Sequence, residues 1–227
     1  MSCVNIRGCR IGEGRPKVIL PIVERTEAAI LEKAAQFSTL SADCVEWRAD
    51  WFEGFQSPAA IARCVHNMRV TLRDKLLLVI LDTACADLLD IEFFTAGADL
   101  PALIEQAHSA GVAVVCSSHD FAKTPPRAEL VSRMVQMQQA GADLPKLAVM
   151  PQCRTDVLEL LAATAEMADL HPGTPVITMS MGALGAVSRL AGETFGSAMT
   201  FANPGQASAP GQVSLDIVNE VLDALHL

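Results

Sequence analysis

The sequence lacks the cysteine spacing of a disulfide framework or a zinc site. Its seven cysteines are scattered over 227 residues, their number is odd, and no two of them form a CxxC motif. Cys44 and Cys116 lie in apolar, strand-like runs, where a cysteine is typical of a small buried hydrophobic residue. We therefore expect reduced thiols and no metal site.

Long apolar runs are also lacking, and none reaches the roughly 20 residues that cross a membrane. Met1–Arg10 shows no apolar stretch of a signal peptide, so we expect a soluble protein of the cytoplasm. The net charge of -9 argues against a nucleic-acid partner, which requires a basic patch. No GxGxxG or Walker motif indicates a bound nucleotide.

Apolar residues are plentiful: they make up 51% of the chain against 19% charged, which predicts a single domain over residues 1–227. After a predicted N-terminal hairpin (Val4–Ile6 and Arg10–Ile11), short β-like runs alternate with helical patterns, as in parallel βαβ units. The predicted strands are Lys17–Pro21, Cys44–Trp47, Lys75–Ile80, Leu88–Phe94, Val112–Cys116, Lys146–Met150, Val176–Met179 and Met199–Phe201. The predicted helices are Thr26–Phe37, Pro58–Met68, Asp99–Ala110, Pro126–Ala140, Thr155–Ala168, Ala183–Leu190 and Gln212–Leu225.

Eight strands in βα alternation predict an α/β fold of the (β/α)₈ TIM-barrel type, with an open doubly wound sheet as the alternative. One connection breaks the pattern. Only the seven residues Leu81–Asp87 separate the third and fourth predicted strands, whereas a parallel crossover takes about a dozen or more. Either one of these two runs is not a barrel strand, or the barrel is irregular around residues 80–88.

A lysine interrupts the apolar strand pattern Leu144–Pro151. Alternation with a period of two puts Lys146, Ala148 and Met150 on one face. If that face is the barrel interior, burial lowers the pKa of the ammonium group and yields the neutral amine that attacks a carbonyl carbon. The alternative is a lysine at a strand edge whose ammonium group reaches water.

His119 follows the predicted strand Val112–Cys116 directly, which places it at the C-terminal face of a barrel, where active sites lie. Histidine titrates near neutral pH and is the usual proton carrier. The alternative is a loop histidine that caps the next helix.

Charged residues also alternate along two other predicted strands. Glu46, Arg48 and Asp50 are spaced by two and could hold a hydroxyl-rich ligand, or form a surface row of salt bridges. Asp90 and Glu92 form a second same-face pair.

Further candidates lie in the last third of the chain. Met179 and Met181 could wall an apolar pocket, although methionines at such spacing are more often core residues. Arg189, Ser208 and Gln212 offer one cation and neutral donors that suit a carboxylate. Pro204–Gly211 has the composition of a flexible loop, either a lid over a site or a plain surface loop.

Taken together, these segments resemble the type I 3-dehydroquinate dehydratase family over nearly the whole chain and in order. The matching stretches are Gly12–Pro21 (GEGRPKVILP), Val45–Asp50 (VEWRAD), Leu89–Phe94 (LDIEFF), Ser117–Phe121 (SSHDF), Leu144–Pro151 (LPKLAVMP), Ile177–Gly182 (ITMSMG), Ser188–Ser197 (SRLAGETFGS) and Ser208–Gln212 (SAPGQ). The lysine strand and the SRLAGETFGS run are specific in combination.

The resemblance implies a cofactor-free lyase of the shikimate pathway that dehydrates 3-dehydroquinate to 3-dehydroshikimate. Lys146 would form an imine with the substrate ketone, His119 would move the protons, and Asp90 would be the acidic partner near that histidine. The substrate-binding residues implied by the family are Glu46, Arg48, Arg189, Ser208, Gln212, Met179, Met181, Phe201 and Pro21. The family also implies a homodimer.

The chain departs from the family after the third strand. About two dozen residues, a loop and a helical crossover, are missing there, and with them the family's arginine at that strand end and a glutamate soon after it. Loss of a barrel helix is expected to expose apolar strand surface and to threaten folding. Two alternatives to a working dehydratase follow: an inactive family member that acts as a binding or interaction protein, and a class I aldolase.

Overall fold

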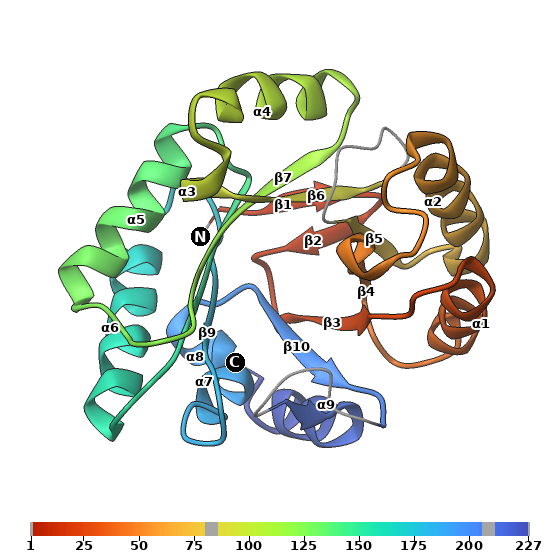
Figure 1. The fold of residues 1–227 in the computed structure, drawn as a ribbon. Helices are drawn as coiled ribbons and strands as arrows, with labels where there is room; N and C mark the ends of the chain where they lie inside the picture. Colours follow the sequence, from red (N-terminus) through yellow and green to blue (C-terminus); the bar gives the residue numbers. More distant parts are fainter. Residues whose placement is uncertain (1, 80–85, 206–211, 227) are drawn as a thin grey trace.

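The computed structural model describes residues 2–79, 86–205 and 212–226, in which parallel strands curve into a barrel surrounded by helices (Figure 1). The barrel strands are β3 (Lys17–Ile22), β4 (Cys44–Trp47), β5 (Leu76–Val79), β6 (Leu88–Glu92), β7 (Ala113–Asp120), β8 (Leu144–Val149), β9 (Ile177–Ser180) and β10 (Met199–Asn203). Each strand from β3 to β8 pairs in parallel with the next, so that β9 ends the row, and β10 pairs with β3. A bridge between Val176 and Ser197 joins the starts of β9 and β10. The predicted (β/α)₈ barrel is confirmed, and the open sheet is wrong.

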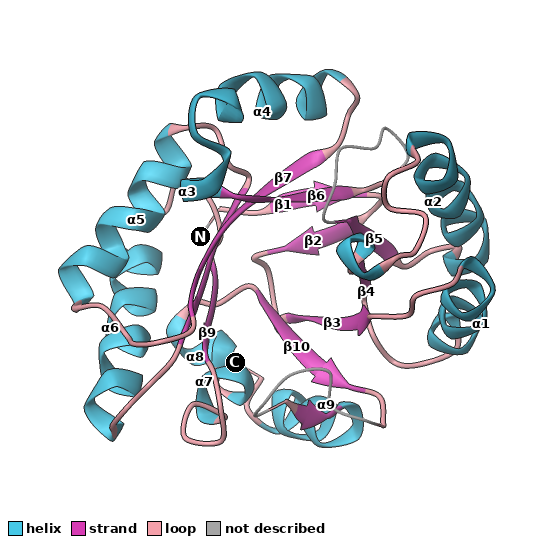
Figure 2. Ribbon diagram, in the orientation of Figure 1, coloured by secondary structure: helices cyan, strands magenta, loops and turns pink. Residues whose placement is uncertain are grey.

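Helices follow the strands on the outside of the ring, as Figure 2 shows. They are α1 (Glu27–Ser38), α2 (Pro58–Leu72), α3 (Phe93–Ala96), α4 (Leu100–Ser109), α5 (Arg127–Gln139), α6 (Arg154–Leu170), α7 (Val187–Leu190), α8 (Gly192–Phe195) and α9 (Leu215–Ala224), with short 3₁₀ turns at Ala49–Trp51 and Gly97–Asp99. Local chemistry sets several of their ends. Thr26 caps α1 and Ser57 caps α2 by accepting a backbone N–H with the side-chain oxygen. Gly111, with a φ of 74°, follows the end of α4, as expected for a C-terminal glycine.

Alternating side chains divide the core into two layers. Inward-facing residues such as Ile19 and Cys44 fill the barrel, whereas outward-facing residues such as Val18 and Leu77 pack beneath the helices. The predicted hairpin forms from β1 (Val4–Ile6) and β2 (Cys9–Ile11). Its Ile11 is fully buried in the inner cluster, so the hairpin closes the end of the barrel at which the strands begin.

The connection between β5 and β6 is eight residues long, and six of these, 80–85, lie outside the described residues. The two strands nevertheless pair in parallel, with Leu78 beside Leu88. Because pairing starts beside the third residue of β5, the chain that leaves Val79 has to return by only one residue position, about 3.3 Å, along the strand. Both predicted runs are therefore barrel strands, and most of the stretch in which the irregularity was predicted lies outside the described residues.

Asp87, the last residue before β6, anchors the end of this short connection to β5. Its carboxylate accepts the Leu77 N–H at 2.8 Å and pairs with Arg69 of α2, while its own N–H donates to the Leu77 carbonyl. The same reciprocal contact joins Asp43 to Val18 and Asp143 to Val114 at the starts of other strand pairs. An aspartate directly before β4, β6 and β8 thus ties each of these strands to the one preceding it.

The expected exposure of apolar strand surface is wrong. The outward-facing side chains of β5, Leu77 and Val79, are fully buried in a cluster with Met68 and Leu72 of α2. Helix α2 extends four residues beyond the predicted end at Met68, and this last turn helps to cover β5.

Other predicted boundaries are also corrected. Strand β7 continues past Cys116 to Asp120, so His119 lies near the end of the strand and not in a following loop. The helix predicted over Ala183–Leu190 shortens to α7, because the chain first makes a tight turn. A Cβ on Gly185 would lie 2.2 Å from the Ser180 carbonyl oxygen, so this close approach of the backbone requires glycine.

Candidate functional site

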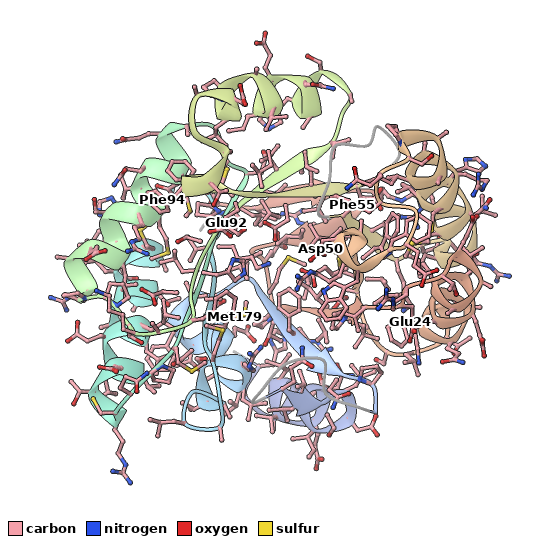
Figure 3. All side chains as sticks on the ribbon, viewed as in Figure 1. Glu24, Asp50, Phe55, Glu92, Phe94 and Met179 are labelled. Carbon is pink, nitrogen blue, oxygen red and sulfur yellow. The ribbon has the colours of Figure 1, made fainter. Side chains whose placement is uncertain are left out.

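A cavity of about 520 Å³ opens at the end of the barrel where the strands terminate. It is lined by Pro21, Val23, Glu46, Arg48, Asp90, Glu92, Thr95, Ser117, His119, Phe121, Lys146, Ala148, Met179, Met181, Arg189, Phe201 and Gln212. Figure 3 shows Glu92 and Met179 near the middle of the ring of strands and Phe94 farther out. Of the residues that the sequence singled out for the site, all but Asp50 and Ser208 therefore line one cavity.

Lys146 lies inside the barrel, as the alternation along β8 predicted, and only 4% of it is exposed. Its Nζ donates to Asp90 Oδ2 at 2.7 Å, lies 3.6 Å from Glu46 Oε1 and sits 5.0 Å from the centre of the Phe201 ring. The alternative of a lysine that reaches water from a strand edge is wrong. A primary amine held here faces the cavity with two carboxylates beside it.

The expected lowering of the lysine pKa is also wrong. Burial is the largest influence on Lys146 and acts downwards, but the carboxylates of Asp90 and Glu46 together outweigh it, so the pKa of Lys146 is raised. The pKa of Glu46 is also raised, in this case by burial, although the positive charge of Lys146 opposes the shift. The resting site is therefore a buried ammonium group with acidic partners, and the ammonium must lose a proton before the nitrogen can attack.

His119 is held by Glu92 and not by Asp90. The His119 Nδ1 lies 2.6 Å from Glu92 Oε2, whereas Asp90 contacts Lys146. The register explains the difference: Asp90 pairs with Val115 deep in the barrel, and Glu92, two residues farther along β6, pairs with Ser117 near the strand ends. The resemblance-based assignment of Asp90 as the partner of the histidine is corrected accordingly.

Arg189 brings a buried cation to the cavity. Only 3% of it is exposed, its Nε has no hydrogen-bond partner in the described structure, and its Nη1 contacts Met179 Sδ at 3.8 Å. Burial lowers the pKa of this guanidinium group. A buried guanidinium group without an acidic partner is costly, and a bound anion would supply the missing hydrogen bonds.

The predicted row of Glu46, Arg48 and Asp50 along one strand face is wrong. Strand β4 ends at Trp47, and the chain then turns into the short helix Ala49–Trp51. Glu46 is buried towards Lys146, whereas Arg48 donates through Nε and Nη2 to Asp50 at 3.0 and 2.8 Å near the surface. Glu46 and Arg48 both line the cavity, but Asp50 does not.

Some of the remaining predicted residues line the cavity, and others lie outside the described residues. Met179 and Met181 both line the cavity, as do Pro21 and Gln212. Ser208 and most of the predicted lid, Pro204–Gly211, lie outside the described residues.

Sequence reasoning missed several lining residues. Ser117 lies on a strand at a position that alternates inwards, and this periodicity could have marked it. Glu92 was predicted only to share a strand face with Asp90 and was given no role. Phe121, whose ring stacks on His119 with centroids 5.8 Å apart, gave no such signal because it follows the strand.

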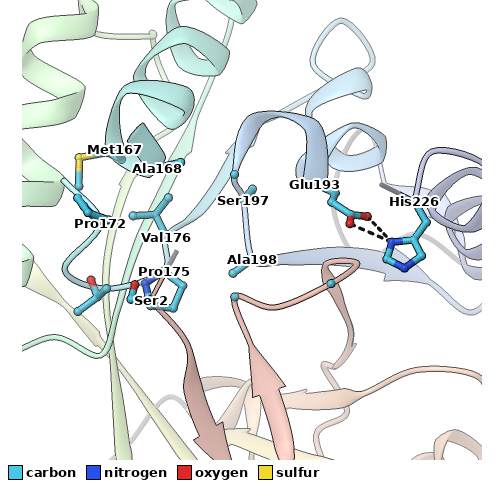
Figure 4. Close-up of a pocket in the computed structure, with 14 residues that line it drawn as sticks. Ser2, Met167, Ala168, Pro172, Pro175, Val176, Glu193, Ser197, Ala198 and His226 are labelled. Carbon is cyan, nitrogen blue, oxygen red and sulfur yellow. Dashed lines mark hydrogen bonds and ion pairs between the residues drawn. The ribbon is translucent and has the colours of Figure 1, made fainter. Parts of the chain in front are cut away.

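A second cavity of about 290 Å³ lies at the opposite end of the barrel (Figure 4). Among its lining residues within the described structure, only Glu193 and His226 carry ionisable side chains, and these two pair at 2.9 Å. Across residues 2–79, 86–205 and 212–226, no group of three or more metal-binding side chains is arranged around a common point. No helix in these ranges has the length and apolarity to cross a membrane.

Comparisons with known proteins point to one family. The family model described as type I 3-dehydroquinase matches residues 18–85 and 71–227. A 3-dehydroquinate dehydratase of Bacillus licheniformis is 42% identical over 247 residues, which cover 98% of this chain and 97% of that protein. A second, from Bacillus subtilis, is 42% identical over 250 residues and covers 100% of this chain and 98% of that protein.

Solved structures agree. A type I 3-dehydroquinate dehydratase from Clostridium difficile, solved with covalently modified comenic acid, superposes with a TM-score of 0.94 at 38% identity and covers 99% of this chain and 98% of that one. A 3-dehydroquinate dehydratase from Geobacillus kaustophilus gives a TM-score of 0.93 at 32% identity, with 99% and 96% covered.

The comparisons also locate the missing segment. The alignment to the Bacillus subtilis protein has 250 positions for 227 residues, so at least 23 positions face a gap in this chain. The two matches to the family model overlap at residues 71–85, a range that contains β5. A deletion after the third barrel strand, predicted from the sequence, is confirmed.

Proposed function

The chain belongs to the type I 3-dehydroquinase family, and we propose that it works through a covalent imine on Lys146. It is a hydro-lyase that dehydrates 3-dehydroquinate to 3-dehydroshikimate in the shikimate pathway. The observation that carries the assignment of the site is the buried Lys146 amine at the floor of a cavity that also holds His119 and Arg189.

In the first step Lys146 adds to the ketone. Its ammonium group gives up a proton, for which the Asp90 carboxylate at 2.7 Å is the nearest acceptor. The free amine adds to the substrate C3 carbonyl, and loss of that oxygen as water leaves an iminium ion. The Phe201 ring beside Nζ and the buried carboxylate of Glu46 favour a cation at this position.

The second step is the elimination. His119 removes a proton from C2, and the electron pair of that C–H bond moves to the iminium nitrogen to form an enamine. The electrons return as the C1–oxygen bond breaks, and the hydroxyl group leaves as water with the proton from His119. Water then hydrolyses the conjugated imine, which releases the product and restores the Lys146 amine.

The substrate carboxylate is held by Arg189. A planar guanidinium group can offer two parallel N–H donors to a carboxylate, and the unpaired Nε of Arg189 is such a donor. Glu46 near the end of β4 and Arg48 just after it also line the cavity and bind ring hydroxyls. Met179, Met181 and Pro21 provide apolar walls, and Gln212 and Ser208 contribute from the C-terminal segment.

The decisive experiment traps the imine. Purified, folded protein is mixed with 3-dehydroquinate and borohydride, and the adduct is mapped by mass spectrometry of peptides. We expect reduction to fix the ligand on Lys146 and Lys146→Ala to abolish both adduct and turnover. Lys123→Ala, which removes a lysine in the loop after β7, is the control and should behave as the unmodified sequence does. Turnover at the normal rate in Lys146→Ala would contradict the mechanism.

The assembly and setting of the enzyme are also proposals. We propose that residues 1–227 act as one domain, because the inner cluster draws side chains from all around the barrel. A homodimer in the cytoplasm is the expected state, and light scattering of the purified protein tests the first part.

A further inference from the structure

Glu92 makes three contacts with a single stretch of β7. Its Oε2 lies 2.6 Å from the His119 Nδ1 and accepts the Ser117 hydroxyl at 3.3 Å, and its Oε1 accepts the His119 backbone N–H at 3.2 Å. One carboxylate therefore holds both the ring and the backbone of the histidine.

The contact with Nδ1 determines which ring nitrogen can act as a base. An ionised carboxylate only accepts hydrogen bonds, so Nδ1 must carry the hydrogen in this contact. The lone pair of the neutral ring is then on Nε2. Phe121 stacks on the ring at an interplanar angle of 8°, so the ring plane is held from a second direction.

No other carboxylate contacts the His119 side chain in the described parts of the chain. Asp90 is engaged by Lys146, and Asp120 accepts the backbone N–H groups of Ala122 and Lys123. A groove next to the cavity is lined by Glu92 and His119 on one side and by Glu129 and Arg133 of α5 on the other. Glu129 pairs with Arg133. Glu92 is the last residue of β6, and the register of β6 against β7 places it beside Ser117, within reach of His119.

We propose that Glu92 is the positioning residue of His119: it fixes the ring with Nε2 as the base and stabilises the imidazolium ion that forms after proton abstraction. This role rests on the proposed function of His119 in the elimination. In this role Glu92 affects only the second step, the elimination, because the carboxylates beside Lys146 are those of Asp90 and Glu46.

Glu92→Gln tests this role with little change in volume. Glu92 accepts the His119 backbone N–H and the Nδ1 hydrogen with two different oxygens, and in glutamine one of these positions becomes an NH₂ group. That group cannot accept a hydrogen bond, and it can donate to Nδ1 and leave Nε2 protonated. We expect borohydride trapping of the imine at the rate of the unmodified protein. Turnover should fall by about 10–10³-fold. The loss should not exceed the loss that removal of His119 itself would cause.

A double-mutant cycle separates positioning from a general structural effect. If Glu92 acts through His119, Glu92→Gln should have almost no further effect on turnover in a His119→Ala background. Equal fold-losses in both backgrounds would overturn the proposal. Glu129→Gln, on the far side of the same groove, is the matched control and should leave turnover unchanged.

The outcomes also distinguish this inference from the proposed function. Absence of an imine in the folded, unmodified protein would refute the function of Lys146. Normal imine formation together with normal turnover in Glu92→Gln would leave that function intact and refute the role of Glu92. Thermal unfolding of each variant shows whether a lost rate reflects lost folding.

Discussion

The Nζ of Lys146 lies 2.7 Å from Asp90 Oδ2, and both side chains are almost completely buried. This ion pair is the reason why the amine of a residue inside the barrel remains protonated at rest. It couples two properties that can be measured separately: the pH at which the amine becomes reactive, and the stability of the barrel interior.

Asp90→Asn should move imine formation to lower pH. In the unmodified protein the carboxylates outweigh burial and raise the pKa of Lys146, so neutral amine accumulates only at higher pH. Without the Asp90 charge, one of the two carboxylates that oppose burial is lost, and the pKa of Lys146 falls. Rates of borohydride trapping, measured up to a pH above the ordinary pKa of a lysine, should show this fall as a midpoint at lower pH. Asp99→Asn, on the exposed surface, is the control; a midpoint that stays in place or rises would contradict the explanation.

Lys146→Met should destabilise the protein by about 3–5 kcal/mol, because it leaves two buried carboxyl groups without a cation. Burial already raises the folded-state pKa of Glu46, and loss of Lys146 raises it further. Such a group contributes stability that is fully present below its unfolded-state pKa and is lost as pH rises through its raised folded-state pKa, so the deficit should grow from acidic towards neutral pH. Urea unfolding at several pH values measures the loss. Lys146→Met combined with Asp90→Asn should recover part of it; a double variant less stable than Lys146→Met would argue against charge as the cause.

Periodicity in the sequence was sufficient to predict the barrel and the inward direction of Lys146. Alternation with a period of two fixes which residues of a strand share a face, and β8 is apolar on both faces except at Lys146. The missing crossover was also visible, because the spacing between Ile80 and Leu88 is a matter of chain length alone.

Contacts between strands could not be predicted in the same way. Whether Asp90 or Glu92 contacts His119 depends on the register of β6 against β7, which no local sequence pattern specifies. The pKa of Lys146 was predicted in the wrong direction because burial was visible in the pattern of β8, whereas the two carboxylates come from β4 and β6. The end of β4 at Trp47 likewise separated Glu46 from Asp50.

Arg189→Lys should raise the KM for 3-dehydroquinate by about 10–100-fold, the equivalent of one lost charge-assisted hydrogen bond of 1.5–3 kcal/mol. The charge is kept, but the planar pair of donors is lost. Imine trapping at saturating substrate should still occur, since Lys146 is unchanged. Steady-state kinetics measure KM and kcat separately. Arg133→Lys, outside the main cavity, is the control, and an unchanged KM in Arg189→Lys would place the carboxylate elsewhere.

Asp87→Ala should be the most damaging substitution at the starts of the strands. It removes the acceptor of the Leu77 N–H and leaves the guanidinium group of Arg69, which is only 16% exposed, without its carboxylate. Loss of one partner of a buried ion pair costs about 3–5 kcal/mol.

Asp143→Ala provides the matched comparison. Asp143 accepts a strand N–H from Val114 in the same way, but its side chain is 31% exposed and its other partner is the exposed His108. Its loss should cost only about 1 kcal/mol, the net value of an ordinary hydrogen bond. Denaturant unfolding of both variants measures the difference. Equal losses would mean that the short connection after β5 does not depend on Asp87, and that α2 alone holds β5 and β6 together.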